Sequence, residues 1–173
     1  MLYLPIEIIQ YISNFLDHIS QLNFISTSCI LRTNINVTNF YVRYLISPKL
    51  INNQLKKHIY IKYLNLSNNE HINDLTYLKY IVKLDISGVC TTTQSNINHL
   101  VNLVELNISN NINICKLGMF KKLEKLYMRG ICNVNIEEIN KLPKLKYLNI
   151  IFNPKRNEII KKLKRKNNIK IVL

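Results

Sequence analysis

The sequence is built on a period of 42 residues. Leu64, Leu106 and Leu148 each begin a similar short segment, and each is followed directly by Asn. A second series, which begins at Leu84 and Leu126, has the same period and falls between the members of the first, so successive units are alternately 20 and 22 residues long. Units this short cannot bury their apolar residues alone, so we expect similar turns of chain that stack on one another.

Each unit follows the pattern Leu-x-x-Leu-x-Leu-x-x-Asn or a close variant, as in residues 103–111. The alternation in the middle predicts a short strand with one buried face, and the Asn is placed to hydrogen-bond the loop that leaves the strand. The two longer units have Val89 or Ile131 in place of the Asn, followed by Cys90 or Cys132. We expect the extra residue to move each Cys into the position of the Asn, where it would pack and not react.

This pattern resembles the leucine-rich repeat family, and the resemblance covers units that begin at Leu64, Leu84, Leu106, Leu126 and Leu148. A weaker sixth strand is expected at 169–171. The resemblance implies an α/β solenoid with short parallel strands over residues 46–173, built from five to six units. Because the units are short, we expect 3₁₀ or irregular turns on the convex side instead of long helices.

Residues 1–45 lack the repeat and are predicted to form three short helices, the third through about 28–46. Pro5 and Glu7 suit the first turn of a helix, and apolar residues recur at helical spacing as far as Leu16. The run Leu4-Pro5-x-Glu7-Ile8-Ile9-x-x-Ile12-x-x-Phe15-Leu16 resembles an F-box. The order of parts, an F-box-like helical segment before leucine-rich repeats, is specific.

The F-box resemblance implies a partner and a function. Such a segment binds the Skp-type adaptor of a cullin ubiquitin ligase, and the protein would be the substrate receptor of an SCF-type ligase. The contact residues that the resemblance implies are Leu4, Pro5, Ile8, Ile9, Ile12 and Leu16. The alternative is that these helices only cover the open end of the stack, as terminal repeats require. The protein would then be a leucine-rich-repeat scaffold or binding protein with no ligase connection.

The outward strand positions of the last two units offer a candidate target site. They combine aromatic area with a guanidinium group, a combination that is enriched in the residues that dominate interface energies. The residues are Tyr127, Arg129, Tyr147, Ile151 and Phe152. The alternative is an ordinary solvated sheet face.

Basic charge is concentrated at the C-terminal end. The net charge is +14, and residues 116–173 hold 13 Lys and 3 Arg against 4 acidic residues. This charge favours an acidic target protein. Residues 154–166 are predicted to form a helix, which could have a merely solvated lysine face, act as a nuclear-localisation signal through 161–166, or bind nucleic acid. Nucleic acid is disfavoured, because the sequence has no recognised nucleic-acid-binding fold.

The sequence indicates a protein that is not an enzyme. His18, His58, His71 and His99 are scattered, the four Cys are far apart, and there is no Gly-rich phosphate loop. We therefore expect no catalytic residues, no metal site and no cofactor. The absence of a long apolar run and of a signal peptide predicts a protein outside the membrane. With reduced cysteines, we expect it in the cytoplasm, or in the nucleus if the basic stretch is a localisation signal.

Overall fold

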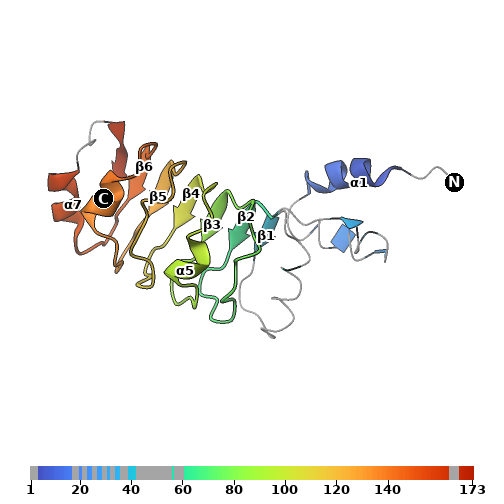
Figure 1. Ribbon diagram of the computed structural model, residues 1–173, viewed down its shortest axis with the longest axis horizontal. Coiled ribbons are helices and arrows are strands. Elements are labelled where there is room, and N and C mark those ends of the chain that lie inside the picture. The colour runs from blue at the N-terminus through green and yellow to red at the C-terminus, as the bar shows by residue number, and fades with distance from the viewer. Residues whose placement is uncertain are drawn as a thin grey trace.

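The computed structural model describes residues 4–16, 20, 23–24, 27–28, 31, 34–35, 39–41, 56, 61–163 and 168–173. Within them, seven strands form one sheet in the order in which they occur in the chain, and every neighbouring pair is parallel (Figure 1). The strands are β1 Asn39–Tyr41, β2 Tyr63–Asn65, β3 Lys83–Asp85, β4 Glu105–Asn107, β5 Lys125–Tyr127, β6 Tyr147–Asn149 and β7 Lys170–Val172. The predicted α/β architecture with a parallel sheet is confirmed.

The described helices are short and lie outside the sheet. They are α1 Ile6–Ser13, α5 Gln94–Ile97, α6 Ile136–Asn140 and α7 Arg156–Lys162. Between β2 and β7, the two 22-residue units hold α5 and α6, of four and five residues. The expectation of short turns in place of long helices is therefore confirmed for these units. The predicted C-terminal basic helix is α7, although residues 164–167 lie outside the described part.

The register of the sheet follows the sequence repeat. Leu64 pairs with Leu84, Leu84 with Leu106, and the same column continues through Leu126 and Leu148. Backbone hydrogen bonds repeat at equivalent positions, since the amide of Val104 donates to the carbonyl of Val82 at 2.8 Å and that of Glu124 donates to Val104 at 2.9 Å. A slip of one residue would expose the whole leucine column, so burial fixes the register.

The core is a continuous row of apolar side chains beneath the sheet. Three positions of each unit point into it, and all are at most 2% exposed: Ile61, Ile81, Leu103, Leu123 and Leu145 before the strands; Leu64, Leu84, Leu106, Leu126 and Leu148 within them; and Leu66, Ile86, Ile108, Met128 and Ile150 after them. Each unit thus contributes three apolar side chains to one layer, and its neighbours cover that layer. This arrangement explains why the repeat is strict at these positions.

The asparagines of the pattern hold the loops that leave the strands. Asn111 accepts a hydrogen bond from the amide of Asn113 at 2.9 Å and donates to the carbonyl of Ile86 in the preceding unit at 2.7 Å. In the longer fourth unit, the thiol of Cys132 donates to the equivalent carbonyl, that of Ile108, at 3.2 Å. The prediction that the extra residue moves the Cys into the role of the Asn is confirmed for Cys132.

One stretch of the N-terminal segment differs from the prediction. A third helix was expected through 28–46, but Asn39–Tyr41 is a strand that pairs with β2. The sheet therefore begins inside the segment assigned to residues 1–45. Tertiary pairing decides this stretch, because an exposed edge of β2 offers backbone partners that a helix pattern does not reveal. Most of the expected second helix lies outside the described residues.

Candidate interaction surfaces

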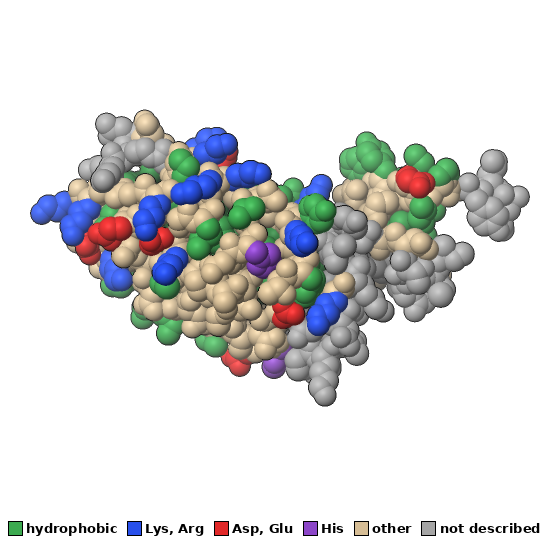
Figure 2. All heavy atoms as spheres, viewed as in Figure 1, with side chains coloured by type: hydrophobic (Ala, Val, Ile, Leu, Met, Phe, Trp, Pro, Cys, Tyr) green, Lys and Arg blue, Asp and Glu red, His purple; other side chains and the backbone are tan. Residues whose placement is uncertain are grey.

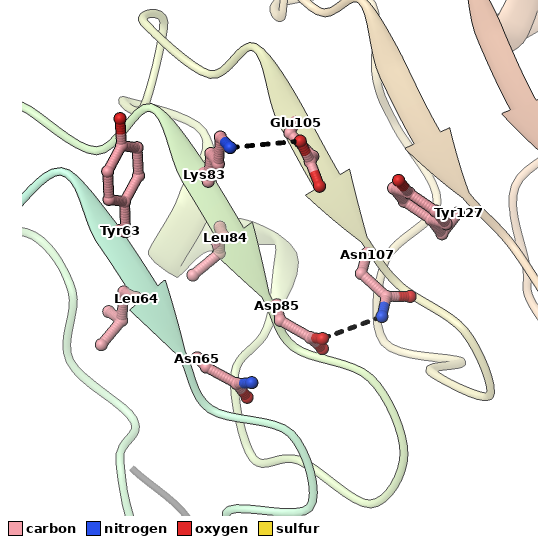
Figure 3. Close-up of a pocket in the computed structure, with 9 residues that line it drawn as sticks. All are labelled: Tyr63, Leu64, Asn65, Lys83, Leu84, Asp85, Glu105, Asn107 and Tyr127. Carbon is pink, nitrogen blue, oxygen red and sulfur yellow. Dashed lines mark hydrogen bonds and ion pairs between the residues drawn. The ribbon is translucent and has the colours of Figure 1, made fainter. Parts of the chain in front are cut away.

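The face of the sheet that points away from the core carries two aligned rows of side chains. The first row contains Tyr63, Lys83, Glu105, Lys125, Tyr147 and Lys170, and the second contains Asn65, Asp85, Asn107, Tyr127, Asn149 and Val172. We call this surface the outer face. Figure 3 shows its N-terminal part, with the first row at the start of the strands and the second at their ends. The outward columns expected from the repeat are confirmed.

Polar contacts between neighbouring strands neutralise much of the N-terminal part of the outer face. The carboxylate of Glu105 lies 3.7 Å from the amine of Lys83 and 3.6 Å from that of Lys125. The side chain of Asn107 donates to the carboxylate of Asp85 at 2.9 Å (Figure 3). The hollow between these residues measures about 280 Å³, at or below the lower end of the ~300–1,000 Å³ usual for small-molecule sites. It suits a protruding side chain better than a metabolite.

The predicted target residues lie toward the C-terminal half of the sheet. The rings of Tyr127 and Tyr147 are 5.3 Å apart between centroids. Burial, followed by the negative charge of Glu105, raises the pKa of Tyr127 above its ordinary value, and a hydrogen bond with Glu105 contributes to the shift. This tyrosine pair offers aromatic area beside the Glu105 carboxylate.

A second hollow follows the ends of the strands. Tyr127, Arg129 and Phe152 line it together with small polar side chains, and its volume is about 640 Å³. Arg129 is exposed, and among the ion pairs of the described residues none involves it. Ile151 is only half-exposed. The structure therefore joins Tyr127, Arg129 and Phe152 in one groove, places Tyr147 beside Tyr127, and gives Ile151 a smaller accessible area.

The residues assigned to adaptor binding lie on or next to α1. Leu4, Ile8 and Ile12 are exposed large apolar residues, and Pro5 is the exposed residue that precedes the helix. Ile9 is half-buried and packs against the core together with Ile6; Leu16 is half-exposed.

The residues that the F-box resemblance assigns to adaptor binding do not include Tyr11, although its ring is exposed on α1. Tyr11 is 63% exposed, and its ring meets that of Phe15, 74% exposed, edge to face at 5.0 Å between centroids. The signal in the sequence is their four-residue spacing, which places the two rings side by side on a helix. Figure 1 shows α1 at the β1 end of the sheet.

Basic side chains gather toward the C-terminal end of the molecule, as the blue groups in Figure 2 show. Some are held by acids of the same region: Lys146 lies 3.0 Å from Glu124, and Lys162 lies 2.9 Å from Glu158. These pairs neutralise single lysines, but the segment has far more cations than acids. A positive field is therefore left at this end.

The structure also bears on the residues with reactive side chains. Cys90 and Cys132 are buried and Cys115 is exposed, all as free thiols. Burial raises the pKa of the Cys132 thiol, which makes it less reactive. Within the described ranges, His, Cys, Asp and Glu do not gather in any group of three suited to a metal ion.

None of the helices in the described part of the chain is long and apolar enough to cross a bilayer.

Comparison with known proteins leaves the fold and the surfaces as the evidence for function. No model of a known protein family matches this sequence, and no curated protein sequence matches it either.

Proposed function

We propose that this chain is a protein-interaction module without enzymatic activity, a leucine-rich-repeat solenoid preceded by an F-box-like segment. In this proposal it is the substrate receptor of an SCF-type ubiquitin ligase. The F-box-like segment binds a Skp-type adaptor and thereby a cullin, and the outer face of the sheet binds a target protein. The in-register parallel sheet with a 20- and 22-residue alternation supports the solenoid assignment.

The observation that carries the adaptor assignment is the accessible apolar surface of α1. Leu4, Ile8 and Ile12, all assigned from the F-box resemblance, remain exposed. An apolar helix face of this kind on a folded protein marks a binding site for another protein. The inward side chains Ile6 and Ile9 are the ones that contact the core, so the helix has one face for the rest of the chain and another for a partner.

In this role the protein acts by proximity. An adaptor bound near α1 and a target bound on the sheet would be held on one chain, and the ligase would meet the target at a high effective concentration. The chain needs no reacting groups of its own for this task. The positive field of its C-terminal end would speed the association of an acidic target and make the rate depend on salt.

The adaptor assignment is tested by a binding assay with a purified Skp-type adaptor. We expect Leu4→Asp combined with Ile8→Asp to lower the affinity at least tenfold, because two carboxylates would be buried against an apolar surface. Asn14→Asp is the matched control. It adds one negative charge, half of what the double variant adds, at the exposed end of the helix and keeps the oxygen that accepts a hydrogen bond from Gln10 at 2.9 Å. Equal affinities for all three proteins would contradict the assignment.

The packing of Ile6 and Ile9 against the core also favours a second function, in which the N-terminal segment only covers the end of a scaffold. Deletion of residues 1–16 separates the two functions. If the segment is an adaptor-binding module, the remaining chain should stay monomeric and lose only the circular dichroism signal of the deleted helix α1. If it is only a cover, the deletion should expose apolar surface and cause aggregation.

The nuclear location proposed for the chain depends on residues 161–166, of which Lys161 and Lys162 belong to α7.

A further inference from the structure

We propose that the loops at the carboxyl ends of strands β3 to β6 form a docking surface for an acidic peptide segment of a partner protein. We call this surface the loop edge, and define it by four apolar side chains and one cation. The apolar residues are Val89, Ile112, Ile131 and Phe152, exposed by 67%, 56%, 64% and 79%, and the cation is Arg129. This surface shares Arg129 and Phe152 with the predicted target site, so the inference rests on the target-binding part of the proposed function and not on the ligase connection.

The four apolar side chains follow one another along the molecule. Each of the strands β3, β4, β5 and β6 is followed within a few residues by one of them. Parallel strands lie about 4.8 Å apart, so the three steps from β3 to β6 cover roughly 14 Å, the length of four to five residues of an extended peptide. Exposed apolar groups in four successive loops offer contacts to one extended segment, and exposed apolar groups that gather in this way are typical of interaction sites.

Two of these side chains point outward at the extra residue of the long units. Val89 and Ile131 are the extra residues of the long units and follow Gly88 and Gly130, whose φ angles are +76° and +64°. The next residue, Cys90 or Cys132, turns into the core instead. An exposed Val or Ile at this position adds nothing to the core, and a polar residue would fit the backbone equally well.

The backbone conformation of Phe152 is the strongest single indication of a binding site. Its φ is +57°, in the left-handed region that an L-residue with a large side chain rarely adopts. The equivalent residues of the preceding units are Asn68, Gly88, Asn110 and Gly130, the residue types that tolerate this conformation. Phe152 is nevertheless mostly exposed, so no packing in this chain offsets its strain. Strain of this kind is concentrated at binding sites.

The charges near the loop edge favour a partner segment with negative charge. Residues 87–93, 109–115, 129–135 and 151–155 contain no Asp or Glu, and their charged residues are Arg129 and Lys155. Arg129 shares the 640 Å³ groove with Phe152, Tyr127 and the hydroxyls and amides of Ser87, Ser109 and Asn149. A guanidinium that shares a groove with two aromatic residues and takes no part in the ion pairs of the described residues is suited to a carboxylate. The partner segment should therefore combine carboxylates with apolar side chains.

The test uses the full chain and a phage-displayed library of random short peptides. Selected peptides should combine Asp or Glu with large apolar residues. Their affinity should fall at least tenfold for Val89→Ser combined with Ile131→Ser, and for Phe152→Asn. Arg129→Gln should lower the affinity and also weaken its dependence on salt.

Two controls separate binding from folding. Phe152→Asn gives the residue found at Asn68 and Asn110, so it should keep or raise the melting temperature while it lowers the affinity. Val101→Ser changes an exposed apolar residue outside the loop edge and should leave the affinity unchanged.

Four results would overturn the proposal. The first is the absence of any enriched peptide, and the second is the selection of peptides without acidic residues. The third is binding that survives all loop-edge variants but is lost with Tyr63→Ala on the outer face. The fourth is self-association of the chain that Val89→Ser with Ile131→Ser abolishes, which would make a second copy the occupant. Each result is read without the adaptor, so it is distinct from a failure of the ligase proposal.

Discussion

At the scale of single residues, the alternation of Asn and Gly at one loop position explains why the repeat consists of two unlike units. The side-chain oxygen of Asn68 lies where a Cβ on Gly88 would be, at 1.9 Å, and the same holds for Asn110 and Gly130. Asn68 accepts a hydrogen bond from the amide of Val89 at 3.3 Å. The short unit thus supplies an Asn whose side chain lies over the next loop, and the long unit must supply a Gly beneath it. This pairing of unlike residues makes 42 residues, and not about 21, the true period.

We predict that Gly88→Ala destabilises the protein by about 1–3 kcal/mol. An alanine there has the left-handed backbone strain, about 1–2 kcal/mol, and it pushes aside the Asn68 side chain. Gly118→Ala is the matched control, because Gly118 has an ordinary φ and a new Cβ would meet the flexible Lys141 side chain at 3.1 Å. It should change stability by less than about 0.5 kcal/mol. Urea denaturation measures the stability of both variants. Equal losses for Gly88→Ala and Gly118→Ala would contradict the role of the alternating Asn and Gly.

At the scale of elements, a side chain of the short helix α6 supports the neighbouring turn. A carboxylate oxygen of Glu138 accepts hydrogen bonds from the amides of Leu117 at 2.7 Å and Gly118 at 3.0 Å, and Lys141 pairs with the other oxygen. The structure places Glu137 and Glu138 in α6 and gives Glu138 a structural role between two units. The helix is capped by Asn135, the residue before it, whose side chain accepts a hydrogen bond from the amide of Glu138 at 3.1 Å.

We predict that Glu138→Ala costs about 1.5–3 kcal/mol, since the buried amide of Leu117 and the part-buried amide of Gly118 lose a charged acceptor. Desolvation alone would raise the pKa of Glu138, but the hydrogen bonds from Lys141, Leu117 and Gly118 hold it below the ordinary value. The charge of Glu138 therefore stabilises the fold above the ordinary Glu pKa, about 4.3, and this contribution disappears as the pH falls through the lowered folded-state pKa.

Glu138→Gln isolates the charge in the same experiment, because it keeps the size of the side chain. The difference in unfolding free energy between this variant and the natural protein should be constant near neutral pH and shrink below pH ~4. A difference that does not change over this range would show that the charge contributes nothing.

At the scale of the whole molecule, stability is shared along a row in which each unit contacts its neighbours. Leu106 is fully buried in the middle of this row, with β3 on one side and β5 on the other. Leu163 is 6% exposed beside the last turn. A cavity in a central unit weakens the packing against two neighbours, and a cavity near the end weakens fewer contacts.

We predict that Leu106→Ala destabilises the protein by about 3–5 kcal/mol, at the upper end of the range for such cavities, and that Leu163→Ala costs less. Val101→Ala, at an exposed position, should cost less than about 0.5 kcal/mol. Thermal and urea unfolding of the three variants test this order. A larger loss at Leu163 than at Leu106 would contradict a core that runs continuously through the units.

The sequence alone determined the repeating part of the molecule. The period placed Leu64, Leu84, Leu106, Leu126 and Leu148 in one buried column and Tyr127 beside Tyr147 on the outer face, because a strand alternates its side chains and a stack of equal units aligns equivalent positions. The role of Cys132 also followed, since one extra residue shifts which side chain turns inward.

Only the tertiary structure decided the features that break the repeat. A helix-like pattern at Asn39–Tyr41 became a strand because β2 offered an edge to pair with. The loop edge was hidden for a similar reason. Val89 and Ile131 occupy a place that is polar and buried in other units, and their exposure depends on how the folded loop places the extra residue, with Cys90 or Cys132 in the core instead, which apolar periodicity does not encode. The strained Phe152 is visible only as a φ angle, because strain belongs to the folded backbone and not to the residue itself.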